Sequence, residues 1–267
     1  MAYILYHSPC FDGFGAAWAA LQGLSGKGHL EFVPVQYGQK VPTLVTWEGS
    51  EHEPMYLVDF SYSRAVLDEL TKGRDLYIID HHKTAQDDLK DYPNTVFDMN
   101  HSGAVLTWQY FFPGRAIPDL LLYVEDRDLW KFQMPNSKEI NAWIASYPKD
   151  FQTWDFLERE LQERGLLEGR AILRFTEQKV KEITDQSFLQ PWEGYGKIPV
   201  VNTSCFMSEV AQELLARHPE SPFVAYRFER ADGCEQWGLR SRKDFDCSEV
   251  AKKLGGGGHP QAAGFVI

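Results

Sequence analysis

Short apolar runs alternate with helix-forming segments through the first part of the chain, and several runs end in polar side chains. Three such runs, with the polar residues that follow them, are residues 3–6 with His7, Met55–Val58 with Asp59, and Leu76–Ile79 with Asp80, His81 and His82. Runs of this length are typical of buried strands. Strands alternating with helices predict a parallel sheet covered on both faces. The polar residues would then lie at its carboxyl edge, where such sheets bind ligands.

The pattern divides the chain into three stretches. Residues 1–150 carry the alternating strands and helices. Residues 151–190 are charged and helical in pattern, which predicts a connection between two domains. Residues 191–267 return to strands and helices and close on the glycine-rich segment Gly255–His259. We therefore expect an α/β fold with a parallel-sheet N-terminal domain, flanking helices and a smaller α/β C-terminal domain.

The composition agrees with two folded domains and limits their partners. The 267 residues carry a formal net charge of −11, which disfavours long duplex nucleic acid because binding it needs a basic surface. The four cysteines form no CxxC pair, and the N-terminus has no charged lead followed by a long apolar run. These features predict a cytoplasmic protein without a membrane span. Whether the protein forms a homodimer is undecided at this point, because the sequence does not determine the oligomeric state.

Acidic and imidazole side chains gather at the predicted strand ends and in the segments that follow them. They are His7, Asp12, Asp59, Asp80, His81, His82 and Asp126. Mixed carboxylate and imidazole ligands favour a divalent ion such as Mn²⁺, with Mg²⁺, Co²⁺ and Fe²⁺ as alternatives. Two neighbouring ions would need roughly this many ligands, with one carboxylate bridging them. Taken singly, each residue could instead cap a helix, form a turn or be a hydrogen-bonded structural residue.

Several sequence blocks resemble the DHH phosphoesterase superfamily and its companion C-terminal domain. In chain order they are His7-Ser-Pro-Cys-Phe-Asp12-Gly13-Phe14, Val58-Asp59, Ile78-Ile79-Asp80-His81-His82, Glu125-Asp126-Arg127-Asp128-Leu129-Trp130, and Gly255–His259 with the following Pro260-Gln261-Ala262-Ala263-Gly264. The superfamily includes RecJ-type exonucleases, oligoribonucleases of the nanoRNase type and family II inorganic pyrophosphatases. The resemblance implies hydrolysis of phosphoesters or phosphoanhydrides by a water that two metal ions activate.

The resemblance also implies a set of metal ligands. Asp59 would bridge the two ions, and His7 would bind one of them. The ligands of the other ion would be Asp12, His81 and Asp126.

Three further residues of these blocks would act beside those ligands. The resemblance gives Asp80 the role of orienting a metal-bound imidazole, and it makes His82 a hydrogen-bond donor or acid that faces the substrate phosphate. Much of the superfamily has an Asp two positions before the residue matched by Asp12, where this chain has Cys10. A thiolate there could bind the first metal, or Cys10 could be a packing residue that leaves this metal weakly held. The sequence leaves both interpretations open.

The C-terminal stretch supplies candidate residues for binding the substrate. Glycines permit consecutive amides to point into one concavity and bind an anion, and a histidine adds a charged donor. The residues expected to do so are Gly256, Gly257, Gly258 and His259. Arg240 could reach a phosphate bidentately or be a surface arginine. Asn202 could contact a nucleotide or only form a turn.

These observations favour a metal-dependent phosphodiesterase that acts on small nucleotide substrates, such as short oligoribonucleotides or dinucleotides. The alternatives within the enzyme class are a 3′,5′-bisphosphonucleotide phosphatase and a cyclic-dinucleotide phosphodiesterase. The alternative outside it is a nucleotide-binding regulatory protein in which Cys10 has impaired one metal site.

Overall fold

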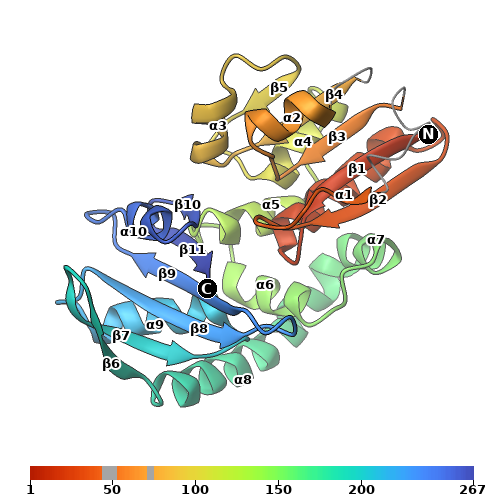
Figure 1. The fold of residues 1–267 in the computed structure, drawn as a ribbon. Coiled ribbons are helices and arrows are strands. Elements are labelled where there is room, and N and C mark those ends of the chain that lie inside the picture. The colour runs from red at the N-terminus through yellow and green to blue at the C-terminus, as the bar shows by residue number, and fades with distance from the viewer. Residues whose placement is uncertain (44–52, 71–74) are drawn as a thin grey trace. The chain divides into compact units, whose positions relative to one another are not determined.

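The computed structural model describes residues 1–43, 53–70 and 75–267, and the chain divides into two compact units (Figure 1). Unit 1 comprises Met1–Leu173 and unit 2 comprises Arg174–Ile267. Each unit has its own sheet with helices packed against it. The α/β class expected from the sequence is confirmed.

Unit 1 contains a five-stranded sheet in the order β2-β1-β3-β4-β5, and all its neighbouring strands are parallel. The strands are β1 (Ala2–His7), β2 (Leu30–Val35), β3 (Met55–Val58), β4 (Leu76–Asp80) and β5 (Thr95–Phe97). The three apolar runs of the sequence predict β1, β3 and β4, whereas β5 has only three residues and gives little pattern. Because β1, β3 and β4 are neighbours, the polar residues at their ends meet at one edge of the sheet.

Helices cover both faces of this sheet, as the alternating pattern predicts. On one face Ile4, Val58 and Ile79 pack with Ala16 and Ala20 of α1, and Leu106 of α4 joins the same cluster. On the other face Leu5, Leu57 and Ile78 pack with Leu67 of α2 and Leu89 of α3. These helices are α1 (Phe11–Leu24), α2 (Arg64–Leu70), α3 (Lys83–Leu89) and α4 (Gly103–Phe111).

The chain leaves the sheet through a series of helices whose core is rich in tryptophan. Trp143 and Trp154 are fully buried there, together with Leu121 and Leu157. The elements are α5 (Asp119–Asp128), α6 (Ser137–Ala145), α7 (Phe151–Glu160), a π-helical segment (Leu161–Gly165) and α8 (Leu166–Thr184). Helix α8 carries the chain from unit 1 into unit 2.

Unit 2 is built on a six-stranded mixed sheet in the order β10-β11-β9-β8-β7-β6. Helix α10 packs on one face against Phe223, Leu239 and Phe265, and helix α9 packs on the other face against Val201 and Val224. The elements are β6 (Phe188–Trp192), β7 (Gly196–Asn202), α9 (Met207–Arg217), β8 (Phe223–Glu229), β9 (Glu235–Ser241), α10 (Cys247–Lys253), β10 (Gly257–His259) and β11 (Ala262–Val266).

The glycine-rich segment differs from the anion-binding loop expected from the sequence. The amides of Gly255 and Gly256 donate to the carbonyls of Lys252 and Ala251 and so end α10. Gly257–His259 then forms β10, which pairs with β11. Gly258 has a φ of 139°, and a Cβ there would lie 2.5 Å from the carbonyl oxygen of Ala262. These glycines therefore permit a helix end and a close strand pairing, in place of four consecutive free amides.

Among the helices of the described residues, none combines the length and the apolar character that a membrane crossing requires.

Candidate metal centre

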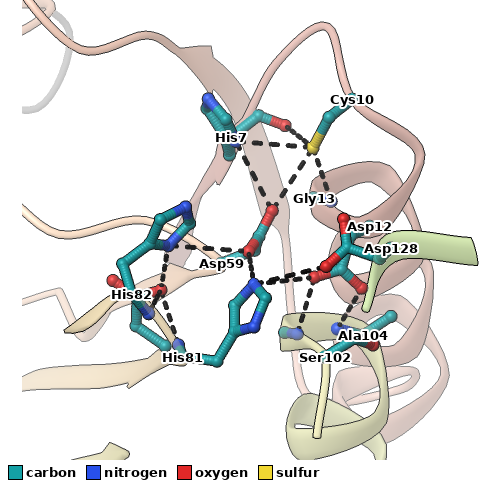
Figure 2. A network of polar contacts seen from close by, with 12 residues as sticks. His7, Cys10, Asp12, Gly13, Asp59, His81, His82, Ser102, Ala104 and Asp128 are labelled. Atoms are coloured by element: carbon teal, nitrogen blue, oxygen red, sulfur yellow. Dashed lines mark hydrogen bonds and ion pairs between the residues drawn. The ribbon is translucent and has the colours of Figure 1, made fainter. Parts of the chain in front are cut away.

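Asp59 lies at the centre of the polar cluster and faces two groups of donor atoms (Figure 2). Its Oδ2 is 3.5 Å from Nδ1 of His7 and 3.3 Å from Sγ of Cys10. Its Oδ1 is 3.1 Å from Nε2 of His81. Asp59 has a φ of 52°, in the left-handed region that is uncommon for a residue other than glycine. This backbone turn at the end of β3 aims the carboxylate across the sheet edge.

The first of these donor groups, which we call the cysteine group, comprises His7, Cys10 and Asp59. His7 ends β1, and Cys10 is the N-cap of α1. The thiol of Cys10 accepts a hydrogen bond from the amide of Gly13 at 3.0 Å and lies 3.4 Å from Nδ1 of His7. The β1–α1 loop therefore brings an imidazole and a sulfur together beside one oxygen of Asp59.

The second group, which we call the aspartate group, comprises Asp12, His81 and Asp128. Nε2 of His81 lies 3.5 Å from Oδ2 of Asp12 and 3.7 Å from Oδ2 of Asp128. The same nitrogen faces Oδ1 of Asp59. The group thus collects carboxylates from α1 and α5 around an imidazole that follows β4.

The N-terminus of α4 holds Asp12 in place. The amides of Gly103 and Ala104 donate to its two oxygens at 2.6 and 3.0 Å, where the partial positive charge of the helix end favours an anion. Ser102 caps the helix through a hydrogen bond that its hydroxyl accepts from the amide of Val105. A Cβ on Gly103 would lie 2.5 Å from Cβ of Asp59. Glycine is therefore the residue that allows α4 to approach so closely.

Asp80 supports His82 rather than the ring of His81. Its Oδ1 lies 2.6 Å from Nδ1 of His82 and accepts hydrogen bonds from the amides of His81 and His82. Its Oδ2 accepts a hydrogen bond from the hydroxyl of Ser61 at 2.7 Å. Asp80 is fully buried, so these contacts fix the Asp-His-His turn.

The electrostatics of the cluster show an excess of negative charge. Burial alone would lower the pKa of His81, but its contact with Asp59 and the charge of that carboxylate raise it to about 11. Burial and the charges of Asp59 and Asp128 raise the pKa of Asp12 well above its ordinary value. Burial and the charge of Asp59 likewise raise the pKa of the Cys10 thiol. In each case the negative charge of the surrounding carboxylates favours the protonated form of the group. A bound cation would compensate the same negative charge.

These residues fit a divalent metal ion. Oδ1 of Asp59 is buried and has no well-aligned hydrogen-bond donor among the described residues, which is costly unless another group binds it. Each carboxylate oxygen has a second lone pair, so Asp12 can bind an ion while it accepts the amides of α4. The donors are the carboxylates and imidazoles that suit Mn²⁺ and related ions, with one sulfur on the side of Cys10.

The structure does not bring Asp126 to this cluster. Its carboxylate accepts hydrogen bonds from the amides of Gln133 and Met134 at 2.8 and 3.1 Å. Asp128, two residues later at the end of α5, lies beside His81 instead. The signal for Asp128 is present in the same sequence block, but the pattern alone does not show which of the two acids faces the sheet edge.

Sequence reasoning also misses Tyr37, which follows β2. Its ring centroid lies 5.4 Å from that of His7 and 5.7 Å from that of His82. The residue is 47% exposed, so part of the ring is available to solvent. No motif surrounds it, because only the sheet order places the end of β2 next to His7.

In unit 2 the structure brings Arg240 and His259 to one row of the sheet. Ala262 is the register partner of Arg240 on β9 and of His259 on β10. Residues directly opposite each other share a face, so both long side chains lie on the same face with a small residue between them. The guanidinium of Arg240 also donates to the hydroxyl of Ser208 at 3.3 Å.

Asn202 does not join this row. Its side-chain oxygen accepts a hydrogen bond from Nε of Arg227 at 2.9 Å, and its register partner on β8 is Arg227. Arg240 pairs with Val224, three positions earlier on β8, which corresponds to about 10 Å along the strand.

Comparison with known proteins agrees with this fold. No family model matches the chain. The chain is 29% identical over 281 residues to uncharacterized protein R106 of Acanthamoeba polyphaga mimivirus, which covers 99% of this chain and 67% of that protein. It is 23% identical over 250 residues to oligoribonuclease NrnB of Bacillus subtilis (strain 168), and this alignment covers 82% of this chain and 61% of that protein.

A solved structure, the DHH domain of a member of a ribosomal protein family, aligns with a TM-score of 0.61 at 13% identity and covers 99% of this chain and 82% of its own. The chain thus has the fold of the DHH superfamily, and the resemblance drawn from its motifs is confirmed. It spans about two thirds or less of the length of the two curated relatives.

Proposed function

We propose that this chain is a metal-dependent phosphodiesterase that hydrolyses small nucleotide substrates such as short oligoribonucleotides or dinucleotides. The observation that carries this proposal is the position of Asp59, whose two oxygens face separate groups of donor atoms. A buried carboxylate placed in this way is suited to bridge two ions.

The proposed ligands follow from the two groups. His7 and Asp59 bind one ion, and Asp12, Asp59, His81 and Asp128 bind the other. Asp128 replaces the Asp126 of the sequence-based set, because the carboxylate of Asp128 lies beside Nε2 of His81, at 3.7 Å. Mn²⁺ is the first candidate, with Mg²⁺, Co²⁺ and Fe²⁺ as alternatives. When bound, the ions would supply a water of lowered pKa and neutralise charge on the phosphate.

His82 is the proposed donor to the substrate phosphate. Burial alone would lower the pKa of this imidazole, but the charge and hydrogen bond of Asp80 raise it above its ordinary value. Asp80 holds Nδ1, so Nε2 is the nitrogen proposed to donate to an oxygen of the substrate. A donor held ready in this way stabilises charge that develops during the reaction.

Unit 2 is proposed to bind a substrate phosphate through Arg240 and His259, with the glycines Gly256, Gly257 and Gly258 giving access to the strand edge. Ala262 between the two side chains leaves room over the sheet. Asn202 is a proposed contact for a more distant part of the nucleotide.

The size and the location of the substrate follow from other features. The net charge of −11 disfavours a long nucleic acid, and the half-exposed ring of Tyr37 offers a surface for a base or sugar. The relative NrnB is an oligoribonuclease, which supports a short RNA substrate. All four cysteines are free thiols, which supports the expectation of a cytoplasmic protein.

The proposal is tested by assaying the purified protein with Mn²⁺ on five substrates: a linear dinucleotide, a longer RNA, a 3′,5′-bisphosphonucleotide, a cyclic dinucleotide and pyrophosphate. We expect turnover of the dinucleotide and none after chelation of the metal. Preferred turnover of the third or the fourth substrate would favour the alternative phosphatase or cyclic-dinucleotide activity. Tight nucleotide binding without turnover of any substrate would overturn the enzyme proposal and favour a regulatory protein.

A further inference from the structure

Cys10 occupies a position at which the structure brings three different donor atoms together. Its Sγ lies 3.4 Å from Nδ1 of His7 and 3.3 Å from Oδ2 of Asp59, and the imidazole nitrogen lies 3.5 Å from the same oxygen. A nitrogen, a sulfur and an oxygen therefore form a nearly equilateral triangle. Each of the three atoms can bind a metal ion once its proton is lost.

The size of this triangle matches one face of a tetrahedral metal site. Bonds of about 2.0–2.3 Å to nitrogen, oxygen and sulfur in a tetrahedral arrangement space the ligands about 3.3–3.7 Å apart. The three distances of the cysteine group, 3.3, 3.4 and 3.5 Å, lie within that range. The donors can therefore bind an ion without a rearrangement of the loop.

A second feature indicates an ion rather than a chance contact. Asp59 is 1% exposed, and its buried carboxylate presents Oδ2 to the imidazole of His7 and the thiol of Cys10. Its backbone adopts the left-handed region to reach this place, which is costly for a side chain that has no function there. In addition, the amide of Gly13 donates to Sγ from the first turn of α1 and holds the sulfur beside Asp59.

We propose that His7, Cys10 and Asp59 form a thiolate-containing site for a thiophilic divalent ion such as Zn²⁺, Co²⁺ or Fe²⁺, whereas the oxygen-rich aspartate group binds Mn²⁺ or Mg²⁺. Soft thiolate selects borderline ions, and carboxylate-rich sites suit the harder ones. The centre then has two unlike sites that share Asp59. The inference rests on the proposed two-metal centre and assigns a different metal class to each half.

The test uses cobalt as a spectroscopic probe of the metal-free, reduced protein. We expect the first equivalent of Co²⁺ to produce an intense thiolate-to-cobalt charge-transfer band in the near ultraviolet. Cys10→Ser is expected to lose this band, and Cys10→Asp is expected to lose it while the site still binds an ion through oxygen. Cys205→Ser is the matched control, because Cys205 is an exposed cysteine of unit 2, and it should keep the band.

A competition experiment provides a readout that is independent of colour. Wild-type protein equilibrated with one equivalent of Zn²⁺ and an excess of Mn²⁺ should retain one ion of each metal after gel filtration, and Cys10→Asp should retain less zinc and more manganese. Binding of two Co²⁺ ions without the charge-transfer band would overturn the thiolate site and leave the proposed phosphodiesterase intact. Conversely, a band that depends on Cys10 in a protein that turns over no substrate would support the thiolate site and overturn the phosphodiesterase.

Discussion

The cysteine group and the aspartate group share Asp59 but are assembled in different ways. His7 and Cys10 lie three residues apart on one loop, so local chain geometry alone brings them together. Asp12, His81 and Asp128 come from α1, the end of β4 and the end of α5, and they meet only when the whole of unit 1 is folded. The comparison shows that one half of the centre is local in sequence and the other half is a product of tertiary packing.

The two groups also differ in their contact with solvent. The side chain of His7 is 26% exposed, whereas that of His81 is 4% exposed. Asp12 is fixed by the amides of α4, while the cysteine group has a single amide, that of Gly13, on its sulfur. We therefore expect solvent to reach an ion at the cysteine group more readily than one at the aspartate group.

The largest effect is expected from the residue that the two groups share. Asp59→Ala removes an oxygen from each group, so both ions and all turnover should be lost. Metal content after gel filtration and the rate on a linear dinucleotide measure the two losses. Asp98→Ala is the matched control, because Asp98 also follows a strand but pairs with Asn100. Retention of both ions by Asp59→Ala would contradict the bridging role.

The difference between the groups also explains how much of the centre the sequence could predict. Apolar runs identify β1, β3 and β4, and the chain order of a parallel sheet places their polar ends at one edge. His7, Asp12, Asp59 and His81 follow from that placement. Tyr37 does not, because its position depends on β2 lying beside β1 in the sheet.

The sequence favours Asp126, whereas the structure places Asp128 beside His81, for a reason that is local and geometric. After α5 the chain turns sharply, and both Trp130 and Phe132 adopt positive φ, at 54° and 47°. Such left-handed turns at residues other than glycine carry little sequence signal. The turn brings the amides of Gln133 and Met134 back onto Asp126, which leaves Asp128 at the sheet edge.

The second largest effect separates these two acids and tests the aspartate group alone. Asp128→Ala should lower kcat by about 10²–10³-fold, since it removes charge that stabilises the reaction, and should leave thermal stability nearly unchanged. Asp126→Ala should instead destabilise the fold by about 1–3 kcal/mol, because it removes two partly buried hydrogen bonds to the amides of Gln133 and Met134. Steady-state kinetics and thermal unfolding measure both variants. If Asp126→Ala lowered kcat and Asp128→Ala lowered the stability, Asp126 would be the metal ligand.

The third prediction concerns the close approach of α4, whose N-terminal amides hold Asp12 of the aspartate group. Gly103→Ala places a Cβ 2.5 Å from that of Asp59, so α4 must move away from Asp12. Misplacement of this order should lower kcat by about 10²-fold. Binding of the first Co²⁺ at the cysteine group should be less affected than binding at the aspartate group. Equal loss at both groups would mean that the two are not assembled independently.

The smallest effect is expected from Asp80, whose carboxylate contacts the aspartate group through the backbone amide of His81 and holds the imidazole of His82 beside it. Asp80→Asn removes the negative charge of the carboxylate that contacts Nδ1 of His82. Loss of such a supporting partner should lower kcat by about 10–100-fold. Because Nε2 of His81 faces Asp12, Asp59 and Asp128 instead, metal content should remain that of the wild type. Ser61→Ala, which removes only the hydroxyl donor to Asp80, is the matched control and should change kcat less. If the bound metal of Asp80→Asn fell by the same factor as its kcat, Asp80 would act through His81. The division of roles between the two histidines would then be wrong.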